Sequence, residues 1–339
     1  MKLTGVGEAS IIGLFRHASE TAARGLLQGI GDDAAVFSSS ADARCLVSTD
    51  LLIENIHFSL RTITPYQLGY KSVAVNVSDI RSMNGRPTYL LLSLALPTEL
   101  EFKEIETFAA GVREAEERFD VSVIGGDTCR SSSGLFIAVT VIGEAAEPVY
   151  RSGAKAGDRL YVTGTVGDSA AGLELLNRLN SRVDLEHPGE ERLAERLGIR
   201  CRNEDIQDLI ERHLMPVPVM KELGPGISAM IDLSDGLLTD LDRLCAASGT
   251  GVRLFVDAVP RSEALQNVCS QLGLNSVDLS LGGGEDYELL YTASAGARVE
   301  GATCIGEIIS GGREMIRENR SVPWPESTGY DHFGSPGKA

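Results

Sequence analysis

The chain has 339 residues, 43% of them hydrophobic and 23% charged, which is typical of a globular protein and long enough for two domains. Its 31 Lys and Arg against 48 Asp and Glu give a net charge of −17, which argues against nucleic acid or an anionic membrane as a partner. Six scattered cysteines without a C-x-x-C pair argue against a disulfide framework and a zinc site. Residues 1–8 lack a signal-peptide pattern and no apolar run reaches membrane-spanning length, so we expect a cytoplasmic protein.

The first half of the chain is predicted to form an α/β unit. We expect a helix within 5–27, strands at 44–49, 73–77, 88–96, 121–125 and 135–143, and an amphipathic helix at 99–119. The last of these helices follows Pro97 and Thr98-Glu99, an N-cap signal. Adjacent strands with helices between them favour an α/β or α+β fold over a barrel.

A Pro/Gly/basic stretch at 147–158 separates two apolar runs, and we place the domain boundary there: 1–147, 148–317 and a tail at 318–339. In the second half we expect strands at 159–164, 228–233, 251–257 and 287–292 and helices at 169–179, within 181–214, at 236–247 and at 261–272. The tail is polar but carries Trp324, Tyr330 and Phe333, and these aromatics predict that it docks on the body of the protein.

Six short segments each end in, or centre on, an aspartate in a Gly, Ser or Thr setting. They are 29–33, 48–50, 76–79, 125–128, 232–236 and 284–288. Four of them adjoin an apolar run predicted as a strand, so they would bring carboxylates from distant parts of the chain to one place. Like charges persist together only when a cation neutralises them, and Mg²⁺ favours hard oxygen ligands that it shares with water and substrate phosphates. The sequence therefore predicts a Mg²⁺-dependent site that handles phosphate.

Each segment also has a structural explanation when it is taken alone. Asp and Gly are common turn residues, and Ser78 or Asp79 would suit the N-cap of a following helix. The segment 232–236 is more specific, because it combines two carboxylates with a helix start behind them. In the segment 282–288, three consecutive glycines are costly in backbone entropy, which favours close approach of a ligand over a purely structural role.

Other site types fail on spacing. The chain has no G-x-x-x-x-G-K-[ST] loop, no H-E-x-x-H motif and no EF-hand loop. Five histidines are widely spaced, and His57 is notable because it follows Asp50 within the same extended region. A polar residue satisfied near a strand end is an equally good explanation of His57.

Taken in order, the motifs resemble the thiamine-monophosphate kinase family, within the superfamily of aminoimidazole ribonucleotide synthetase and selenophosphate synthetase. The matching strings are GIGDDAAV, STDLLIENIHF, YKSVAVNVSDI, GGDT, RSGAKAGDRLYVTGTVGDSAAGL, IDLSDGL, GGGEDYEL and GYDHF. The resemblance implies a two-domain α/β (α+β) fold of the aminoimidazole ribonucleotide synthetase type, with mixed sheets flanked by helices. It also implies a homodimer built through the N-terminal halves, with nucleotide bound in the cleft.

The same resemblance implies site residues. The implied Mg²⁺ ligands are Asp33, Ser48, Thr49, Asp50, Asp79, Asp127, Asp232 and Asp235. The implied ATP contacts are Gly126, Asp127, Arg151 and Ser234, and the implied thiamine-phosphate contacts are His57, Glu285 and Tyr330. Five of the aspartates would act in catalysis through the metal: Asp33, Asp50, Asp79, Asp127 and Asp232.

The expected reaction is direct transfer of the γ-phosphate of ATP to thiamine monophosphate, giving thiamine diphosphate and ADP. A phosphate oxygen is already an anionic nucleophile, so no strong general base is needed. Arg151 would bind phosphate with two donors, and Glu285 and Tyr330 would meet the thiazolium and aminopyrimidine by charge and ring contact. Two alternatives stay open: another ATP-dependent synthetase of the superfamily, which releases phosphate, and a non-catalytic protein that binds metal and thiamine phosphate.

Overall fold

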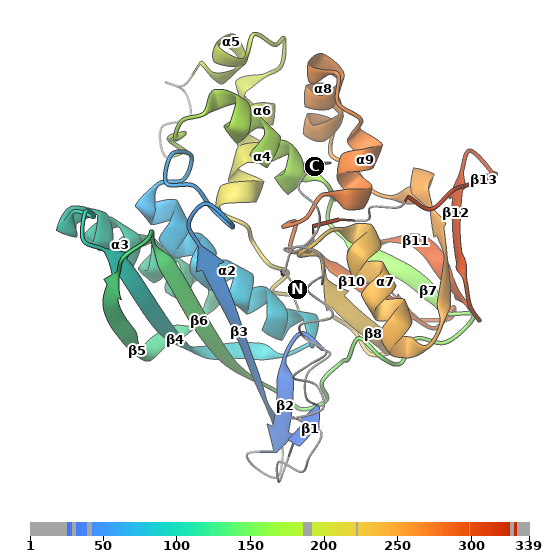
Figure 1. Cartoon of the computed structure of the whole chain (residues 1–339). Coiled ribbons are helices and arrows are strands. Elements are labelled where there is room, and N and C mark those ends of the chain that lie inside the picture. The colour runs from blue at the N-terminus through green and yellow to red at the C-terminus, as the bar shows by residue number, and fades with distance from the viewer. Residues whose placement is uncertain are drawn as a thin grey trace, which may run out of the picture.

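The protein is built from two mixed β-sheets and the helices that cover them (Figure 1). The computed structural model describes residues 26–28, 32–38, 43–185, 192–221, 223–297, 299–325 and 329–330. Within these residues one sheet has six strands in the order β1-β2-β3-β6-β4-β5, and the other has seven in the order β13-β12-β9-β11-β7-β10-β8. The predicted fold class, mixed sheets flanked by helices, is confirmed.

The first sheet contains β1 (Leu26–Gln28), β2 (Ala35–Ser38), β3 (Arg44–Ile53), β4 (Arg86–Pro97), β5 (Ser122–Ser131) and β6 (Phe136–Ala145). Only the β4–β5 pair is parallel among these strands. Helices α2 (Pro65–Ser82) and α3 (Phe102–Phe119) lie on one face (Figure 1). Side chains on a strand alternate between faces, so Ser48 and Asp50 point toward α2 while Thr49 and Leu51 face away.

Helix α2 corrects the prediction of a strand at 73–77. It begins after a capping box in which Thr64 and Gln67 bond each other's backbone, with Pro65 at its first position. It packs against the sheet, α3 and α6, so nearly all of its residues are buried. A helix buried on all sides has a continuous apolar run, which periodicity cannot distinguish from a buried strand. Asp79 therefore lies in the last turn of α2 and is not the N-cap of a following helix.

Two glycines set the close approach of α2 and α3. A Cβ atom on Gly69 would lie 2.1 Å from the carbonyl oxygen of Phe108, and one on Gly111 would lie 1.9 Å from that of Tyr66. Only glycine fits at both positions, so any side chain there would push the helices apart. Because α2 carries Asp79, this contact helps to fix where that carboxylate stands.

The second half contains seven strands and most of the helices. Its strands are β7 (Arg159–Thr163), β8 (Ile227–Asp232), β9 (Gly251–Phe255), β10 (Leu289–Ala293), β11 (Ala302–Ile309), β12 (Arg313–Arg317) and β13 (Arg320–Val322). Its helices are α4 (Asp168–Leu179), α5 (Leu193–Leu197), α6 (Asn203–Leu214), α7 (Leu237–Ser248), α8 (Glu263–Leu272) and α9 (Ser276–Gly282), with a 3₁₀ turn at Val256–Ala258.

Four of these elements were not predicted: α9, β11, β12 and β13. Strand β11 carries an irregularity between Cys304 and Gly306, and β12 and β13 have only five and three residues, so none shows a clean alternation. β13 lies inside the residues assigned to a tail. The predicted helix at 5–27 lies outside the described residues, except that Leu26 begins β1.

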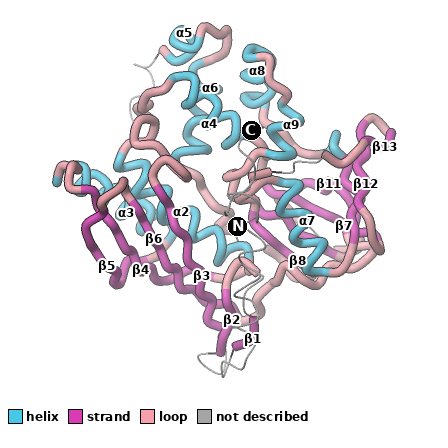
Figure 2. Tube along the Cα trace, viewed as in Figure 1, coloured by secondary structure: helices cyan, strands magenta, loops and turns pink. Residues whose placement is uncertain are grey.

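Buried hydrophobic side chains of the described residues form three clusters, and the largest joins the two halves. It is continuous from the first sheet, α2 and α3 into α4, α5, α6 and α8, which lie at the top of Figure 2. The second lies between the second sheet and α7, and Trp324 of the predicted tail packs against it. The third is small and centres on Met230, Leu289 and Tyr291. In the described part of the chain, no helix is both long and apolar enough to cross a membrane.

Candidate active site

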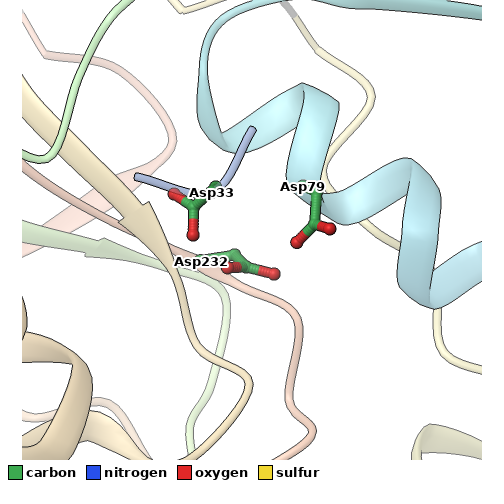
Figure 3. Close-up of side chains that lie close together, drawn as sticks. All are labelled: Asp33, Asp79 and Asp232. Carbon is green, nitrogen blue, oxygen red and sulfur yellow. The ribbon is translucent and has the colours of Figure 1, made fainter. Parts of the chain in front are cut away.

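Three aspartates from distant segments point their carboxylates at one another (Figure 3). Asp33 precedes β2, Asp79 lies in the last turn of α2, and Asp232 is the last residue of β8. One carboxylate oxygen from each lies within 4.8 Å of the others. The arrangement joins the two halves of the chain, because Asp232 comes from the second sheet.

Two serine hydroxyls hold this cluster in place. Ser48 Oγ donates to Asp79 Oδ2 at 2.5 Å and also lies 3.0 Å from the carbonyl oxygen of Asp33. Ser78 Oγ donates to Asp232 Oδ2 at 2.6 Å. Ser48 was among the residues implied by the resemblance, whereas Ser78 was not assigned, although it stands beside Asp79 in the motif VNVSD.

Arg151 and Asp32 complete one side of the cluster. Arg151 Nε donates to Asp33 Oδ1 at 3.1 Å, and a terminal guanidinium nitrogen bonds the same oxygen. The backbone N–H of Arg151 donates to Asp32 Oδ2 at 2.9 Å. Arg151 is thus anchored by one aspartate through its backbone and engages the next through its side chain. The guanidinium group is thus directed at the carboxylate of Asp33.

The remaining predicted carboxylates Asp50 and Asp235 stand next to the cluster. Burial, with the carboxylates of Asp33 and Asp235, raises the pKa of Asp50 to about 6. Burial, with Asp50, Asp232 and Asp33, raises the pKa of Asp79 well above its usual value. Burial and the carboxylate of Asp33 raise the pKa of Asp232 well above its usual value. Each group therefore makes ionisation of its neighbours costly, as expected for carboxylates that share a small buried volume.

Asp235 is also tied to the start of α7. Arg243 pairs with Asp235 and donates to Asp240 Oδ1 at 2.9 Å. The other oxygen of Asp240 accepts the backbone N–H groups of Asp235 and Gly236, at 3.0 and 3.1 Å. Asp240 and Arg243 thus position the segment 232–236, and sequence reasoning assigned neither of them.

The donor set suits Mg²⁺. Asp33 Oδ2 is buried and has no hydrogen-bond partner, which is costly for a carboxylate oxygen unless a cation meets it. Carboxylate and hydroxyl oxygens are the hard ligands that Mg²⁺ prefers, and Asp33, Asp79 and Asp232 present them at one place. These three residues, with Ser48, Asp50 and Asp235 beside them, would hold the ion.

Asp127 is not brought to the cluster within one chain. It is exposed on the edge strand β5, with β4 and β6 between it and β3. It aligns through Ser93 and Ala138 with Leu51, and aligned residues share a face of a sheet. Asp127 therefore lies on the face that points away from α2.

Thr49 and Gly126 have local roles in the sheet. The hydroxyl of Thr49 donates to the carbonyl oxygen of Val139 and accepts from Thr140 Oγ1, both at 3.0 Å, on the face away from the aspartates. Gly126 has a φ of +152°, and a Cβ atom there would lie 1.7 Å from the carbonyl oxygen of Leu92. A close approach of β5 to β4 therefore requires glycine at this position.

The predicted substrate residue Glu285 lies close to the aspartates. It has a φ of +65°, and its backbone N–H donates to the carbonyl oxygen of Ser234 at 2.8 Å. Tyr287 also has a positive φ, of +52°, and is buried. Two strained non-glycine residues in one loop are a feature of functional sites. Ser234, predicted to contact ATP, thus holds this loop through its carbonyl group.

His57 and Tyr330 flank the same region. His57 accepts the backbone N–H of Ile53 at its Nδ1, at 3.0 Å, and its charge acts on Glu285. Tyr330 is 49% exposed, and its backbone N–H donates to the carbonyl oxygen of Asp235 at 3.2 Å. His57 therefore lies near the loop at Glu285, and Tyr330 contacts the aspartate segment. Phe333 lies outside the described residues.

Gly283 and Gly284 lie in close contact with neighbouring segments of the chain. A Cβ atom on Gly283 would lie 2.4 Å from Cβ of Ala170, and one on Gly284 would lie 2.5 Å from the carbonyl oxygen of Ser234. The expectation of a ligand as the main reason for these glycines is wrong for these two positions. Close contact between chain segments explains them.

Comparison with known proteins agrees with the geometry. Residues 31–145 match the family described as AIR synthase related protein, N-terminal domain, and residues 155–304 match its C-terminal domain. The thiamine-monophosphate kinase of Salmonella typhimurium is 36% identical over 346 residues, covering 97% of this chain and 99% of that protein. That of Aquifex aeolicus is 37% identical over 295 residues, covering 86% and 87%.

A solved structure named "AaThiL complexed with AMPPCP and TMP" has the same fold. It matches with a TM-score of 0.83 and 33% sequence identity, and the match covers 98% of this chain and 99% of that one. The likeness thus extends through both sheets. The chain belongs to the thiamine-monophosphate kinase family, within the AIR-synthase-related proteins.

Proposed function

We propose that the aspartate site carries out the reaction of the thiamine-monophosphate kinases: it transfers the γ-phosphate of ATP directly to thiamine monophosphate, giving thiamine diphosphate and ADP. The observation that carries the proposal is the convergence of Asp33, Asp79 and Asp232 from three distant segments, with one buried oxygen of Asp33 unpartnered. Mg²⁺ bound there would neutralise charge on the phosphates of the two substrates.

The protein residues then act by holding and orienting. Ser48 and Ser78 hold the carboxylates of Asp79 and Asp232, so the cluster is preorganised before substrates arrive. Arg151 stands at its edge with a guanidinium group that pairs with Asp33. Since this group offers several donors in one plane, it suits a phosphate oxygen brought to the same edge.

No general base is required for this transfer. The attacking atom is an oxygen of the thiamine phosphate group, which is already anionic at neutral pH, and ADP leaves as its bond to the γ-phosphorus breaks. Positioning and charge neutralisation are therefore the main tasks of such a site. Nothing in this reaction calls for a covalent phosphoenzyme, and we infer direct transfer.

Glu285, His57 and Tyr330 are proposed to bind the thiamine phosphate. They belong to three segments, and each lies beside the aspartate segment 232–235 or the loop that packs on it. Tyr330 is exposed and offers an aromatic ring next to the backbone of Asp235. The acceptor would thus lie between this group and the metal cluster.

We further propose a homodimer in which Asp127 and Gly126 serve the site of the partner subunit. The face of the first sheet that points away from α2 exposes Leu51 (49%), Tyr89 (49%) and Leu91 (37%), an apolar surface of the kind buried in subunit interfaces. Asp127 lies on this same face. A second copy packed there would carry Asp127 toward another site, which one chain alone does not do.

The deciding experiment is incubation with ATP, Mg²⁺ and thiamine monophosphate, followed by chromatography of both nucleotide and thiamine products. We expect equal amounts of ADP and thiamine diphosphate without free phosphate. ADP with free phosphate and no thiamine diphosphate would favour a synthetase of the same superfamily. Binding of thiamine monophosphate without ADP formation would favour the non-catalytic alternative.

Variants test the residues. Asp50→Asn and Asp79→Asn should each lower turnover about a hundredfold or more, because each removes a charge from the proposed metal site. Asp278→Asn, at an exposed aspartate of α9, is the matched control and should keep normal turnover. Near-normal rates in both site variants would overturn the metal assignment.

A cytoplasmic location and the lack of nucleic-acid or membrane partners stay predictions.

A further inference from the structure

A buried cluster of polar side chains lies behind Glu285. Lys71 Nζ is 3.0 Å from Glu285 Oε1, and His213 Nδ1 is 3.4 Å from Glu285 Oε2. The same nitrogen of His213 is 3.1 Å from Ser169 Oγ. Lys71 comes from α2, about two turns before Asp79, whereas His213 and Ser169 come from α6 and α4.

The side chains of this cluster differ in how much of their surface is exposed. The side chain of Lys71 is 3% exposed and that of His213 is 8% exposed, while that of Glu285 is 28% exposed. Of these three side chains, only Glu285 is therefore partly accessible to a ligand. Lysine is almost never buried without a partner, so the ion pair with Glu285 is what allows Lys71 to lie here.

The charge of Glu285 is already matched by the protein. Burial works to raise the pKa of Glu285, but the ammonium group of Lys71 outweighs it, and the pKa is lowered. Burial and then Lys71 lower the pKa of His213 to about 3, so this imidazole is neutral at physiological pH. Lys71 and Glu285 together form a neutral unit, with Lys71 on its buried side.

The orientation of Glu285 is fixed as well. Its backbone is held to Ser234, its Oε1 to Lys71, and its Oε2 lies 3.4 Å from His213 Nδ1, so the carboxylate has little freedom to turn. An ionised carboxylate has no proton to donate and can only accept hydrogen bonds. The group presented to a ligand is therefore a fixed acceptor whose charge is already paired with Lys71, which suits a neutral N–H donor better than a second cation.

We propose that Lys71 is a positioning residue for substrate choice: it holds Glu285 so that the carboxylate accepts from an amino group on the heteroaromatic ring of the substrate and does not act as counter-ion to the thiazolium. The inference rests on the proposed function and changes the role given to Glu285 there. The ligand class is an amino-substituted heteroaromatic phosphate, and an analogue with a carbonyl in place of the amino group should be rejected. A carbonyl oxygen facing this carboxylate would leave both acceptors unpaired.

The test compares thiamine monophosphate with its oxo analogue, in which the pyrimidine amino group is replaced by a carbonyl, and measures kcat and KM for each and KM for ATP. Wild type should prefer the amino substrate by about tenfold or more in kcat/KM. Lys71→Met leaves Glu285 without its partner, so it should raise KM for thiamine monophosphate and reduce the amino-to-oxo preference about tenfold. KM for ATP should stay within about twofold, and Lys71→Arg should recover part of the preference.

Glu285→Gln provides a second variant that keeps the shape of the side chain and adds a donor. It should also lose the preference, and the double variant with Lys71→Met should lose no more than either single one. Arg212→Met is the matched control: it removes a partner of Glu288 in the same loop, at 2.8 Å, and should lower the melting temperature without changing the preference.

The outcomes separate the inference from the function it rests on. If wild type forms no thiamine diphosphate, the proposed function fails. If wild type is active but Glu285→Gln, or a folded Lys71→Met, keeps the wild-type preference, the inference is overturned and the function stands. A change in preference in Arg212→Met equal to that in Lys71→Met would likewise overturn it, because any weakening of the loop would then have the same effect.

Discussion

Ser78 Oγ donates a hydrogen bond to Asp232 Oδ2 at 2.6 Å, across 154 residues of sequence. Ser78 belongs to α2 in the first half, and Asp232 ends β8 in the second. Both are buried. The contact therefore couples the docking of the two halves to the position of a proposed metal ligand.

Ser78→Ala should lower both stability and activity. It leaves a buried carboxylate oxygen without its donor, which costs about 1 to 3 kcal/mol of unfolding free energy. Turnover should fall because Asp232 loses its orientation. Urea unfolding and steady-state kinetics are the measurements. Ser72→Ala on the same helix is the control, since the buried Ser72 hydroxyl bonds only the carbonyl group of Gly69, at 2.8 Å, and that variant should keep its activity.

Mg²⁺ should stabilise the folded protein through Asp79. An ion that binds the native state alone raises the melting temperature as its concentration rises above the dissociation constant. We expect a concentration-dependent rise for wild type in the absence of nucleotide, reversed by a chelator, and little rise for Asp79→Asn. Differential scanning fluorimetry measures both. An equal rise in the two proteins would show that the ion binds elsewhere.

The sequence predicted most of this site because the motifs that form it are local. Asp33, Asp79 and Asp232 each stand in a short string of small and acidic residues, and the structure brings the three together. Lys71 stands in the matching string YKSVAVNVSDI, but neither Lys71 nor His213 was assigned a role. Both gain one only when α2 and α6 meet the loop at Glu285. Tertiary packing alone supplies that information.

The errors in the fold have a related cause. The run Val73–Val77 has the composition of a strand, but it is the middle of a helix covered on all sides, where burial removes the helical period. Strands β12 and β13 are short and contain three arginines, so they lack the apolar signal of a strand. Their pairing with β9 and with each other decides their structure. Composition does not show such partners.

Asp127 gives a test of a site shared between subunits. If Asp127 of one subunit serves the site that contains Asp79 of the other, Asp79→Asn and Asp127→Asn are each inactive as homodimers. A mixed dimer then contains one intact site of two and should have about half of wild-type activity. Co-expression with two affinity tags, followed by assay of the purified mixed dimer, measures this.

Two results would contradict the shared site. Activity in the Asp127→Asn homodimer would remove this residue from catalysis, and an inactive mixed dimer would place both aspartates in one chain. Leu51→Arg is a companion variant on the exposed sheet face, where a buried charge should weaken the dimer. Both its sedimentation coefficient and its activity should be lower than those of wild type.

Asp286 predicts how stability depends on pH. Its carboxylate accepts the backbone N–H groups of Gly167 at 2.6 Å and Ser169 at 3.1 Å, at the start of α4. Burial nevertheless raises the pKa of Asp286 to about 7, with Arg212 opposing the shift and Asp168 adding to it. The folded state thus binds this proton more tightly than the unfolded state, in which the pKa is about 3.9.

The stability from this group is therefore fully present below about pH 4 and is lost as pH rises through about 7. Asp286→Asn carries no titrating proton there, so it isolates the effect. The difference obtained by subtracting the unfolding free energy of the variant from that of wild type should be larger at pH 5 than at pH 8. Urea unfolding at several pH values gives this difference. If it stays constant or grows with pH, the two N–H bonds outweigh burial and Asp286 is ionised throughout.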